Sequence, residues 1–431
     1  MAKNIFKKIK IYHILIFTFI VRFILLPWTF HGDITVTYWW GQFTSEFGFR
    51  GFYDWINFGG YGRPDQPMLN IFYIEGVRQI YSLLHSFFWF LNVNIPIFPS
   101  KFMEWFFLNG NQILLKFPMI IFDILIIYTS FKFIKIQFNE KKAKIIAIIL
   151  TFYPPMIYNS SVWGSGDSIV NFFALLSVYF AWQKKYIYSS LFFIISVLYK
   201  PSLLIWAPIL LVCFLKNKIK IRELMVTIFF SLSCISLISF PFNPVEINPL
   251  IWFYQTMTTK ILPGAMPQIT ANAMNIWALI YGLLPQRLDK SLIFNLISHR
   301  QFSLIICSIF YLIICFKLYK KYTIQNLLLS LVNITLITFM FMTRMHERYT
   351  FPALIPLLML CFYDKKFIKY FFILSITHLL NVYNWWWIPN IKPLIFILKQ
   401  DFFVRLISLT NLLITLKIFS FNFKNKSLCS K

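Results

Sequence analysis

Long apolar segments separated by short basic clusters are the main pattern of this chain. Apolar runs recur from one end to the other, and most lysines fall between them. Because a helix needs roughly 20 apolar residues to cross a bilayer, these runs predict an all-α polytopic membrane protein with about twelve spans, in a range of about 10 to 14. The expected spans are 11–29, 112–131, 145–158, 169–182, 187–199, 202–215, 224–240, 302–316, 325–342, 351–363, 371–387 and 394–416.

The basic clusters orient these spans. They include residues 3–10, 132–144, 216–222 and 417–431. Cytoplasmic loops carry an excess of Lys and Arg, so both termini are expected in the cytoplasm. The first span starts like a signal peptide, but no small-residue cleavage site follows it, so it is expected to be retained. The lack of organelle-specific signals favours a prokaryotic plasma membrane.

The first external segment is expected at residues 30–111. Within it, 34–47 and 71–91 interleave aromatic and polar side chains, which predicts amphipathic helices on the membrane surface. A second region, 243–300, has a weaker pattern. It either forms a short membrane hairpin near 273–298 or lies on the surface.

The domain organisation follows from the recurrence of spans along the whole chain. The sequence is expected to form one integral-membrane domain over 1–431. A module over 1–223 is expected to precede more variable helices over 224–431, which carry the charged stretch described below. We see no internal repeat of fixed period, which argues against an inverted-repeat transporter.

Composition and charge narrow the class of protein. Of 431 residues, 58% are hydrophobic, more than a soluble domain can bury. The net charge of +26 resides in the clusters between apolar runs, where it suits anionic membrane lipids. Because no basic patch lies on a soluble domain, we expect no nucleic-acid partner.

The stretch 343–352 carries a dense group of charges beside expected spans. Charge next to hydrocarbon is costly and is usually functional. Two arginines with a histidine suit an anion such as a phosphate. The stretch therefore predicts an anion site at the membrane surface. Its ionisable residues are Arg344, His346, Glu347 and Arg348.

Two aspartates in the external segment are candidates for chemistry. Asp33 follows the first span directly, and a half-desolvated carboxylate there suits a general base. The alternative is that Asp33 caps a helix expected at 34–45. Asp65 lies between prolines in the turn-rich stretch 59–67, where it either orients a substrate or is a plain turn residue.

The stretch 161–168 and Lys200 are further candidates. Trp163 offers a ring face for a sugar, the glycines beside it allow close backbone approach, and Asp167 supplies a charge. The alternative is a loop in which Asp167 caps the next span. Lys200 lies on the external side at a break before Pro201. It either pairs with a phosphate or snorkels to the surface.

Charged residues inside the expected spans are interpreted as structural. Arg22 lies in the first span and Asp123 in the second, and they are expected to neutralise each other. In the last span Asp401 and Arg405 are spaced i, i+4 and are expected to pair.

The motifs of this chain resemble those of GT-C integral-membrane glycosyltransferases. The stretch 345–352 resembles the "MHERY" and "FP" signature of the Gpi18-like mannosyltransferase group. It also resembles the "HEK" motif of the glucosyltransferases that use dolichyl-phosphate-glucose in N-glycan assembly. Asp33 matches the acid that follows the first helix in this family, and Lys200-Pro201 matches its Lys-Pro break.

Two further matches are less complete. The turn 64–67 resembles a "DYPP" turn without its Tyr, and 162–168 resembles a "WGQxDS" loop in which Ser165 replaces Gln. These departures bear on sugar and acceptor preference more than on reaction class. The matched order and spacing cover about residues 30–352.

The resemblance implies a GT-C fold and transfer of one sugar from a polyprenyl-phosphate-sugar to a lipid-linked or polymeric glycan acceptor. The reaction is expected on the non-cytoplasmic face, with inversion and with Asp33 as general base. The residues expected to bind the donor phosphate are His346, Arg348, Arg344 and Lys200. Those expected to bind or orient the substrate are Asp65, Trp163, Asp167, Glu347 and Tyr349.

The chain lacks an Asp-x-Asp motif and a soluble βαβ pattern, consistent with a donor that is not a nucleotide sugar. No cofactor is expected to be required. A divalent ion (Mg²⁺ or Mn²⁺) held by Asp33, Asp65 or Asp167 is the alternative, and the nearby cations favour a metal-independent site.

Three other function classes compete with this interpretation. A lipid-linked-sugar flippase or other transporter needs polar residues on a path from face to face. A transferase of acyl or phospho groups needs a paired-histidine or metal-carboxylate pattern, neither of which is evident in the sequence. A non-catalytic subunit of a glycan-assembly complex would never turn over a donor.

Overall fold

The computed structural model describes residues 9–55, 62–244, 247–264, 266–283 and 287–423. Residues 1–8 and 424–431, whose lysines helped to orient the termini, lie outside the described residues. Residues 59–61, at the start of the turn-rich stretch, also lie outside them. The chain divides into two compact units. The N-terminal unit comprises Met1–Tyr179, Tyr186–Pro201 and Ile221–Ala265. The C-terminal unit comprises Phe180–Lys185, Ser202–Lys220 and Met266–Lys431.

The described chain is almost entirely helical, and the expected all-α polytopic membrane protein is confirmed. Six of the described helices are long and apolar enough to cross a membrane, or seven if one bent pair counts as a span. Four shorter apolar helices accompany them. The total of about twelve spans and the single domain over 1–431 stay predictions.

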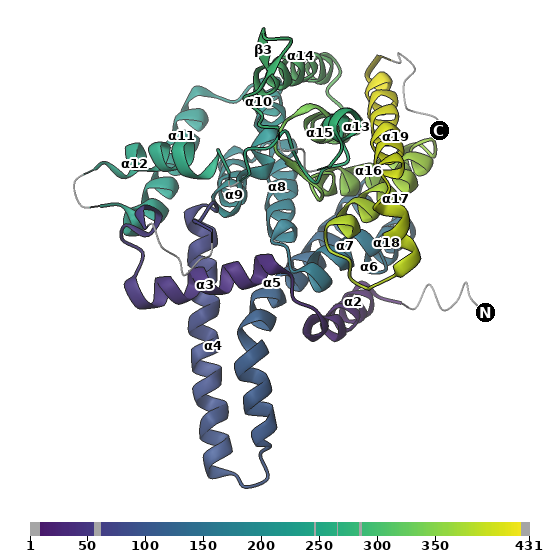
Figure 1. The fold of residues 1–431 in the computed structure, drawn as a ribbon. Coiled ribbons are helices and arrows are strands. Elements are labelled where there is room, and N and C mark those ends of the chain that lie inside the picture. Colours follow the sequence, from purple (N-terminus) through teal and green to yellow (C-terminus); the bar gives the residue numbers. More distant parts are fainter. Residues whose placement is uncertain (1–8, 56–61, 245–246, 265, 284–286, 424–431) are drawn as a thin grey trace. The chain divides into compact units, whose positions relative to one another are not determined.

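The N-terminal unit contains the first expected external segment. The segment's two amphipathic patterns are confirmed as helices α3 and α4; their position on a membrane surface stays a prediction. In Figure 1, α4 runs beside α5 as a long hairpin. The helices of this unit are α2 (Ile11–Leu25), α3 (Gly32–Phe47), α4 (Met68–Asn94), α5 (Ser100–Gln137), α6 (Glu140–Thr151), α7 (Pro154–Ile157), η3 (Tyr158–Trp163), α8 (Asp167–Trp182), α9 (Tyr186–Tyr199), α11 (Ile221–Ser239), α12 (Pro249–Thr256) and the short η1 (Leu26–Trp28), η2 (Phe52–Asp54), η5 (Phe240–Phe242) and η6 (Met257–Ile261).

An aromatic core joins α4 to the short elements η2 and η5 of this unit. Phe242 is fully buried and packs against Phe52, Tyr53 and Phe72.

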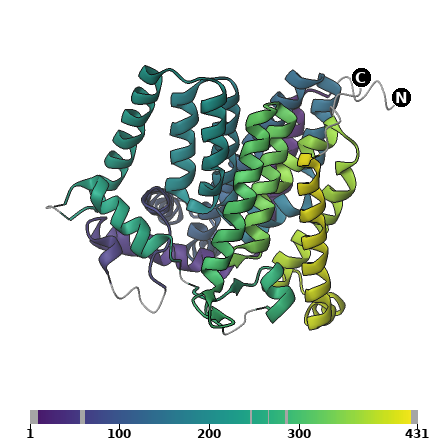
Figure 2. The same ribbon diagram turned by 90° about the horizontal axis from the view of Figure 1, so that it is seen from above.

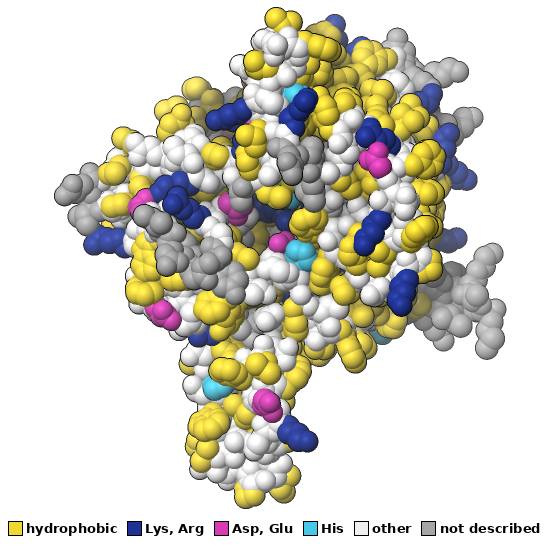
Figure 3. All heavy atoms as spheres, viewed as in Figure 1, with side chains coloured by type: hydrophobic (Ala, Val, Ile, Leu, Met, Phe, Trp, Pro, Cys, Tyr) yellow, Lys and Arg dark blue, Asp and Glu magenta, His cyan; other side chains and the backbone are white. Residues whose placement is uncertain are grey.

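Hydrophobic side chains also cover much of the surface of the α4–α5 hairpin (Figure 3). Many of them are exposed, as lipid-facing or interfacial side chains are.

The run expected as a single span at 145–158 is broken in the structure, and whether it crosses a membrane as one span stays a prediction. Helix α6 ends at Thr151, and the chain resumes at Pro154 with a bend of 50°. Pro154 and Pro155 lack a backbone N–H, so the carbonyls four residues before them have no helical donor. The sequence contained this signal. The run expected at 394–416 is likewise divided, between α18 and α19.

The C-terminal unit is built on a buried helix. Every residue of α15 from Leu327 to Phe341 is buried, and α14 and α16 pack against it. Figure 2 shows α14 and α15 side by side. The elements of this unit are η4 (Pro201–Trp206), α10 (Ala207–Lys216), β1 (Thr270–Ala271), α13 (Ile276–Tyr281), β2 (Leu292–Ile293), β3 (Ile297–Ser298), α14 (His299–Lys320), α15 (Ile324–Phe341), β4 (Met345–His346), α16 (Phe351–Tyr363), α17 (Phe367–Trp385), α18 (Lys392–Leu398), α19 (Asp401–Ser420) and η7 (Phe421–Phe423).

Two small sheets occupy the region whose pattern was weak. Strand β1 pairs in parallel with β4, with Thr270 opposite Met345, and β2 pairs with β3 as a hairpin. In the described part of 243–300, the helices α12 and α13 have eight and six residues, too short for a straight span of roughly 20 residues.

Candidate functional site

Asp33 lies in the first turn of α3, with its side chain 51% exposed. The residue that caps this helix is His31, whose Nδ1 accepts a hydrogen bond from the Asp33 backbone N–H at 3.0 Å. The interpretation of Asp33 as the cap is therefore wrong. A carboxylate in the first turn of a helix is stabilised by the helix dipole, which favours the charged form that a base needs.

Trp163 holds one oxygen of the Asp33 carboxylate. Its indole N–H donates to Asp33 Oδ2 at 3.1 Å. The indole is fully buried and stacks on the His31 ring, with centroids 3.9 Å apart. The buried indole thus holds the carboxylate in one orientation. The other oxygen, Asp33 Oδ1, lies 3.4 Å from His31 Nδ1, and the Asp33 side chain as a whole is half exposed.

Gly164 makes this close packing possible. Its φ is +83°, a backbone conformation that favours glycine, and it ends the η3 turn that carries Trp163. A Cβ at this position would lie 2.7 Å from Lys116 Cγ and 2.9 Å from Ile34 Cδ1. A larger residue here would require the Lys116 and Ile34 side chains to shift.

Lys116 is a buried cation beside the Asp33 turn that the sequence reasoning missed. Its ammonium donates to the carbonyl oxygens of Leu26 and Thr29, at 2.9 Å each. Those carbonyls lie at the end of the first span, a few residues before Asp33. Lys116 therefore holds the backbone segment that leads into the turn with Asp33. A lysine in the middle of an apolar run was the available signal.

Asp167 and Lys200 form a second buried pair in the same unit. Lys200 Nζ donates to Asp167 Oδ1 at 2.6 Å, and the side chains are 10% and 9% exposed. The pair ties the first residue of α8 to the residue after α9. The snorkelling interpretation of Lys200 is wrong, because the ammonium is bound inside; a role toward a donor phosphate stays a prediction.

Asp65 is partly buried in the turn before α4. Its Oδ1 accepts a hydrogen bond from the Gln66 side chain at 2.9 Å. The Tyr53 hydroxyl donates to the Gln66 carbonyl at 2.7 Å, which ties this turn to the aromatic core. The turn is thus ordered rather than loose, and the role of Asp65 toward a substrate stays a prediction.

Glu347 organises the charged stretch in the C-terminal unit. It is buried and accepts a hydrogen bond from Arg348 Nη1 at 2.5 Å, while His346 Nδ1 lies 3.8 Å from its other oxygen. Burial raises the pKa of the Glu347 carboxyl, but the charges of Arg348 and His346 outweigh it and hold the pKa below its usual value of 4.5. Tyr349 lies beside His346, with ring centroids 5.3 Å apart.

Arg344 makes a bidentate contact with one carboxylate through one edge of its guanidinium. Its Nε and Nη2 donate to Asp289 at 2.7 and 3.0 Å. Asp289 is buried. It lies in the region 243–300, whose sequence pattern did not indicate a partner for Arg344. Arg344 has a φ of +62°, a left-handed conformation rare for a residue with a side chain. This geometry holds Arg344 beside the strand that carries His346.

The structure joins Asp33 directly to Trp163, and Asp167 to Lys200, in the N-terminal unit. In the C-terminal unit it joins Glu347 to Arg348. Among the described residues, no group of three or more His, Cys, Asp and Glu side chains is placed to hold a metal ion. The N-terminal arrangement presents a fixed, exposed carboxylate, and the C-terminal one presents partly exposed cations around a buried acid.

Comparison with known proteins assigns the chain to a family. The model of the "ALG6, ALG8 glycosyltransferase family" matches residues 110–398, more than half of the chain. No curated protein matches the chain significantly. The Gpi18-like grouping is not confirmed, whereas the resemblance to glucosyltransferases of N-glycan assembly agrees with the match. The chain belongs to the ALG6, ALG8 glycosyltransferase family.

Proposed function

We propose that this membrane glycosyltransferase moves one hexose from a polyprenyl-phosphate-sugar to a lipid-linked or polymeric glycan acceptor, and that the hexose is mannose or glucose. The single observation that carries this proposal is the Asp33 carboxylate, half exposed and held by the buried Trp163 indole. A carboxylate that is held in one orientation and stays half exposed is suited to accept a proton from an acceptor hydroxyl.

The reaction is a single inverting displacement. Asp33 takes the proton of the acceptor hydroxyl, and the hydroxyl oxygen forms a bond to the anomeric carbon. The bond between that carbon and the donor phosphate oxygen breaks, and the lipid phosphate leaves with the electron pair. The transition state has oxocarbenium character, as in glycoside hydrolysis.

The donor phosphate is assigned to the charged stretch of the C-terminal unit. Arg348 and His346 have side chains 14% and 30% exposed, so both are partly open to solvent. Glu347 is buried and holds Arg348, so it orients that cation rather than meeting the phosphate itself. Cations aimed at a leaving phosphate stabilise the charge that develops as the sugar departs.

The remaining assignments follow the same chemistry. Arg344 and Lys200 supply further positive charge toward the phosphate. Asp65, Trp163, Asp167 and Tyr349 bind or orient the sugar and acceptor. The donor tail lies in the bilayer, the reaction occurs on the non-cytoplasmic face, and both termini are cytoplasmic. No cofactor is required.

The test is mass spectrometry of lipid extracts from the purified protein in nanodiscs. The protein is incubated with a panel of polyprenyl-phosphate hexoses and pentoses, with crude host lipids as acceptors. Consumption of one donor by the wild type supports the proposal and names the sugar. Folded protein that consumes no donor refutes it.

The phosphate assignment has its own test. Arg348→Ala should weaken binding of the consumed donor, because a charged contact to phosphate is lost. Lys369→Ala, a lysine in α17 outside the charged stretch, is the control. Donor affinity that is equal in wild type and Arg348→Ala removes Arg348 from the phosphate site.

A further inference from the structure

A carboxylate inside the N-terminal unit binds both ends of the loop that carries Trp163. Asp123, in α5, is fully buried. Its Oδ2 accepts hydrogen bonds from Arg22 Nε and Ser160 Oγ, both at 2.7 Å. Its Oδ1 accepts one from Ser168 Oγ at 2.6 Å. Hydrogen bonds to an ionised acceptor are shorter and stronger than neutral ones, so each of these contacts restrains its partner.

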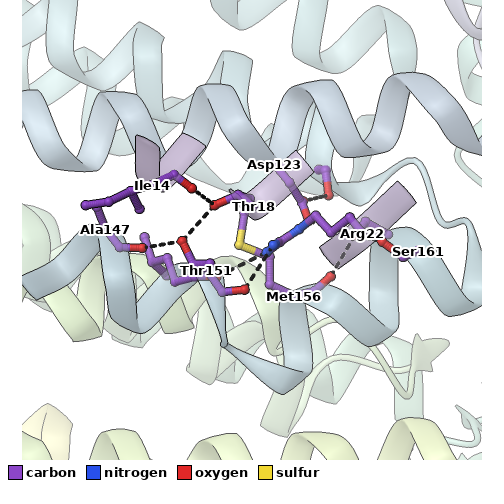
Figure 4. Close-up of polar contacts among 11 residues, drawn as sticks. Ile14, Thr18, Arg22, Asp123, Ala147, Thr151, Met156 and Ser161 are labelled. Atoms are coloured by element: carbon purple, nitrogen blue, oxygen red, sulfur yellow. Dashed lines mark hydrogen bonds and ion pairs between the residues drawn. The ribbon is translucent and has the colours of Figure 1, made fainter. Parts of the chain in front are cut away.

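Arg22 neutralises Asp123, as the sequence predicted, but it also repairs the break after α6 (Figure 4). Its Nη1 and Nη2 donate to the carbonyls of Thr151 and Leu150, at 3.0 and 3.1 Å. These are the carbonyls whose helical donor, the backbone N–H four residues on, is absent because of the two prolines that follow. Each guanidinium nitrogen therefore donates within this network.

Charge neutralisation alone does not require the two serines. Ser160 and Ser168 lie on either side of Trp163, one in η3 and one in the first turn of α8. Between them the chain passes through Gly164 and reaches Asp167, the partner of Lys200. One carboxylate thus fixes both ends of a short loop.

The fixed loop places one hydrogen-bond donor, the Trp163 indole N–H, against Asp33. The carbonyl of Val162 accepts from the Thr29 hydroxyl at 3.0 Å, and the backbone N–H of Ser165 donates to the Asn159 carbonyl at 2.9 Å. These contacts set the path of the loop at its centre. The Trp163 indole N–H then meets the Asp33 carboxylate.

We propose that Asp123 is a positioning residue for Asp33: by binding Ser160 and Ser168 it holds the loop that places the Trp163 indole against the proposed base. The inference rests on the proposed function, in which Asp33 is the general base. Asp123 itself never meets the substrate. Its effect on the reaction passes through the serines, the loop and Trp163.

The test replaces the serines, because removing Asp123 would leave the Arg22 charge unpaired. Ser168→Ala and Ser160→Ala each remove one restraint from the loop. Ser177→Ala is the matched control: Ser177 is also a fully buried serine of α8, and its hydroxyl lies 3.4 Å from that of Ser189, outside this network.

The first readout is hydrogen–deuterium exchange of the full-length protein in nanodiscs, without any ligand. Peptides that cover 158–168 should exchange at least about tenfold faster in Ser168→Ala and Ser160→Ala, because a buried charge-assisted bond is lost. Exchange in the Ser177→Ala control should match the wild type in these peptides. Wild-type exchange in both loop variants would overturn the proposal.

The second readout is turnover of the polyprenyl-phosphate hexose that the wild type consumes. Ser168→Ala should lower kcat by about tenfold and leave KM within about twofold, because positioning acts on the reacting state. In a Trp163→Phe background, which lacks the indole N–H, Ser168→Ala should cost less than about twofold more. Additive losses would overturn the proposal.

The two ideas fail in different ways. Normal turnover by Asp33→Asn would refute the proposed base and leave the exchange result intact. Normal exchange at 158–168 in the serine variants would refute the loop anchor, whatever Asp33→Asn does.

Discussion

Lys200→Met tests how far the buried pair between Lys200 and Asp167 supports the N-terminal unit. The substitution keeps the length and apolar stem of the side chain and removes its charge. Both side chains are about nine-tenths buried, and their atoms lie 2.6 Å apart. Removing one partner of such a pair leaves a buried charge without compensation, which costs about 3–5 kcal/mol.

A double variant separates the lost charge from the lost side chain. Lys200→Met with Asp167→Asn removes both charges and should recover most of the loss, because a neutral pair of similar volume is close to neutral in stability. Lys135→Met is the control. Lys135 pairs with Glu140 in the same unit, but both side chains are about half exposed, so its loss should leave the melting temperature close to that of the wild type.

The assay is thermal unfolding of the four proteins in the same nanodiscs, followed by intrinsic fluorescence. A cost of this size should lower the melting temperature of Lys200→Met by at least about 5 °C, and the double variant should regain most of it. Equal melting temperatures for Lys200→Met and Lys135→Met would refute the reasoning. A double variant as unstable as Lys200→Met would also refute it.

Three further predictions concern single residues. The pKa of Glu347 is held below its usual value of 4.5, so the stabilisation that its charge gives should be present above pH 4.5 and be lost as the pH falls below 4.5. Hydrogen exchange at 344–348 should therefore rise below pH 4.5 in the wild type but not in Glu347→Gln. Gly164→Ala should destabilise by more than about 1 kcal/mol, because its φ is positive and its Cβ would clash, whereas Gly76→Ala, in open space within α4, should stabilise by about 0.5–1 kcal/mol in a melting experiment. Arg348→Lys should weaken donor binding nearly as much as Arg348→Ala, since an ammonium cannot donate to Glu347 and to a phosphate with the fixed planar geometry of a guanidinium. Binding equal to the wild type would contradict this.

Much of the fold could be predicted because hydrophobicity is a local property of the chain. Every expected apolar run is helical over most of its length, and the expected break at Lys200-Pro201 is present. The break at Pro154 was readable and was missed. The apolar run at 145–158 has a suitable length for a span, and its length was given more weight than the missing backbone N–H groups of Pro154 and Pro155.

The pairing of charged side chains was less predictable, because it depends on segments far apart in the sequence. Arg344 and Asp289 are 55 residues apart, and Lys200 and Asp167 are 33 apart. Residue type indicated that these charges needed partners, but not which ones; the pair of Arg22 and Asp123, 101 positions apart, was predicted because both charges lie inside expected spans. The i, i+4 pair of Asp401 and Arg405 was predictable from spacing alone and is confirmed.

The Asp33 site shows the same division. Its position after the first span and the Trp-containing loop were both readable from the sequence. The contact between them joins residues 130 positions apart, and the Lys116 ammonium reaches 87 positions back to Thr29. Such contacts follow from how α3, α5 and η3 pack, which no local pattern encodes.

The most direct test of the account is the turnover rate of Asp33→Asn. The rate is measured by mass spectrometry with the donor that the wild type consumes, in nanodiscs, beside Asp401→Asn, which neutralises an exposed acid outside the site. The account predicts a loss of about 100-fold or more for Asp33→Asn and wild-type turnover, within about twofold, for Asp401→Asn. Turnover by folded Asp33→Asn at the wild-type rate would contradict it.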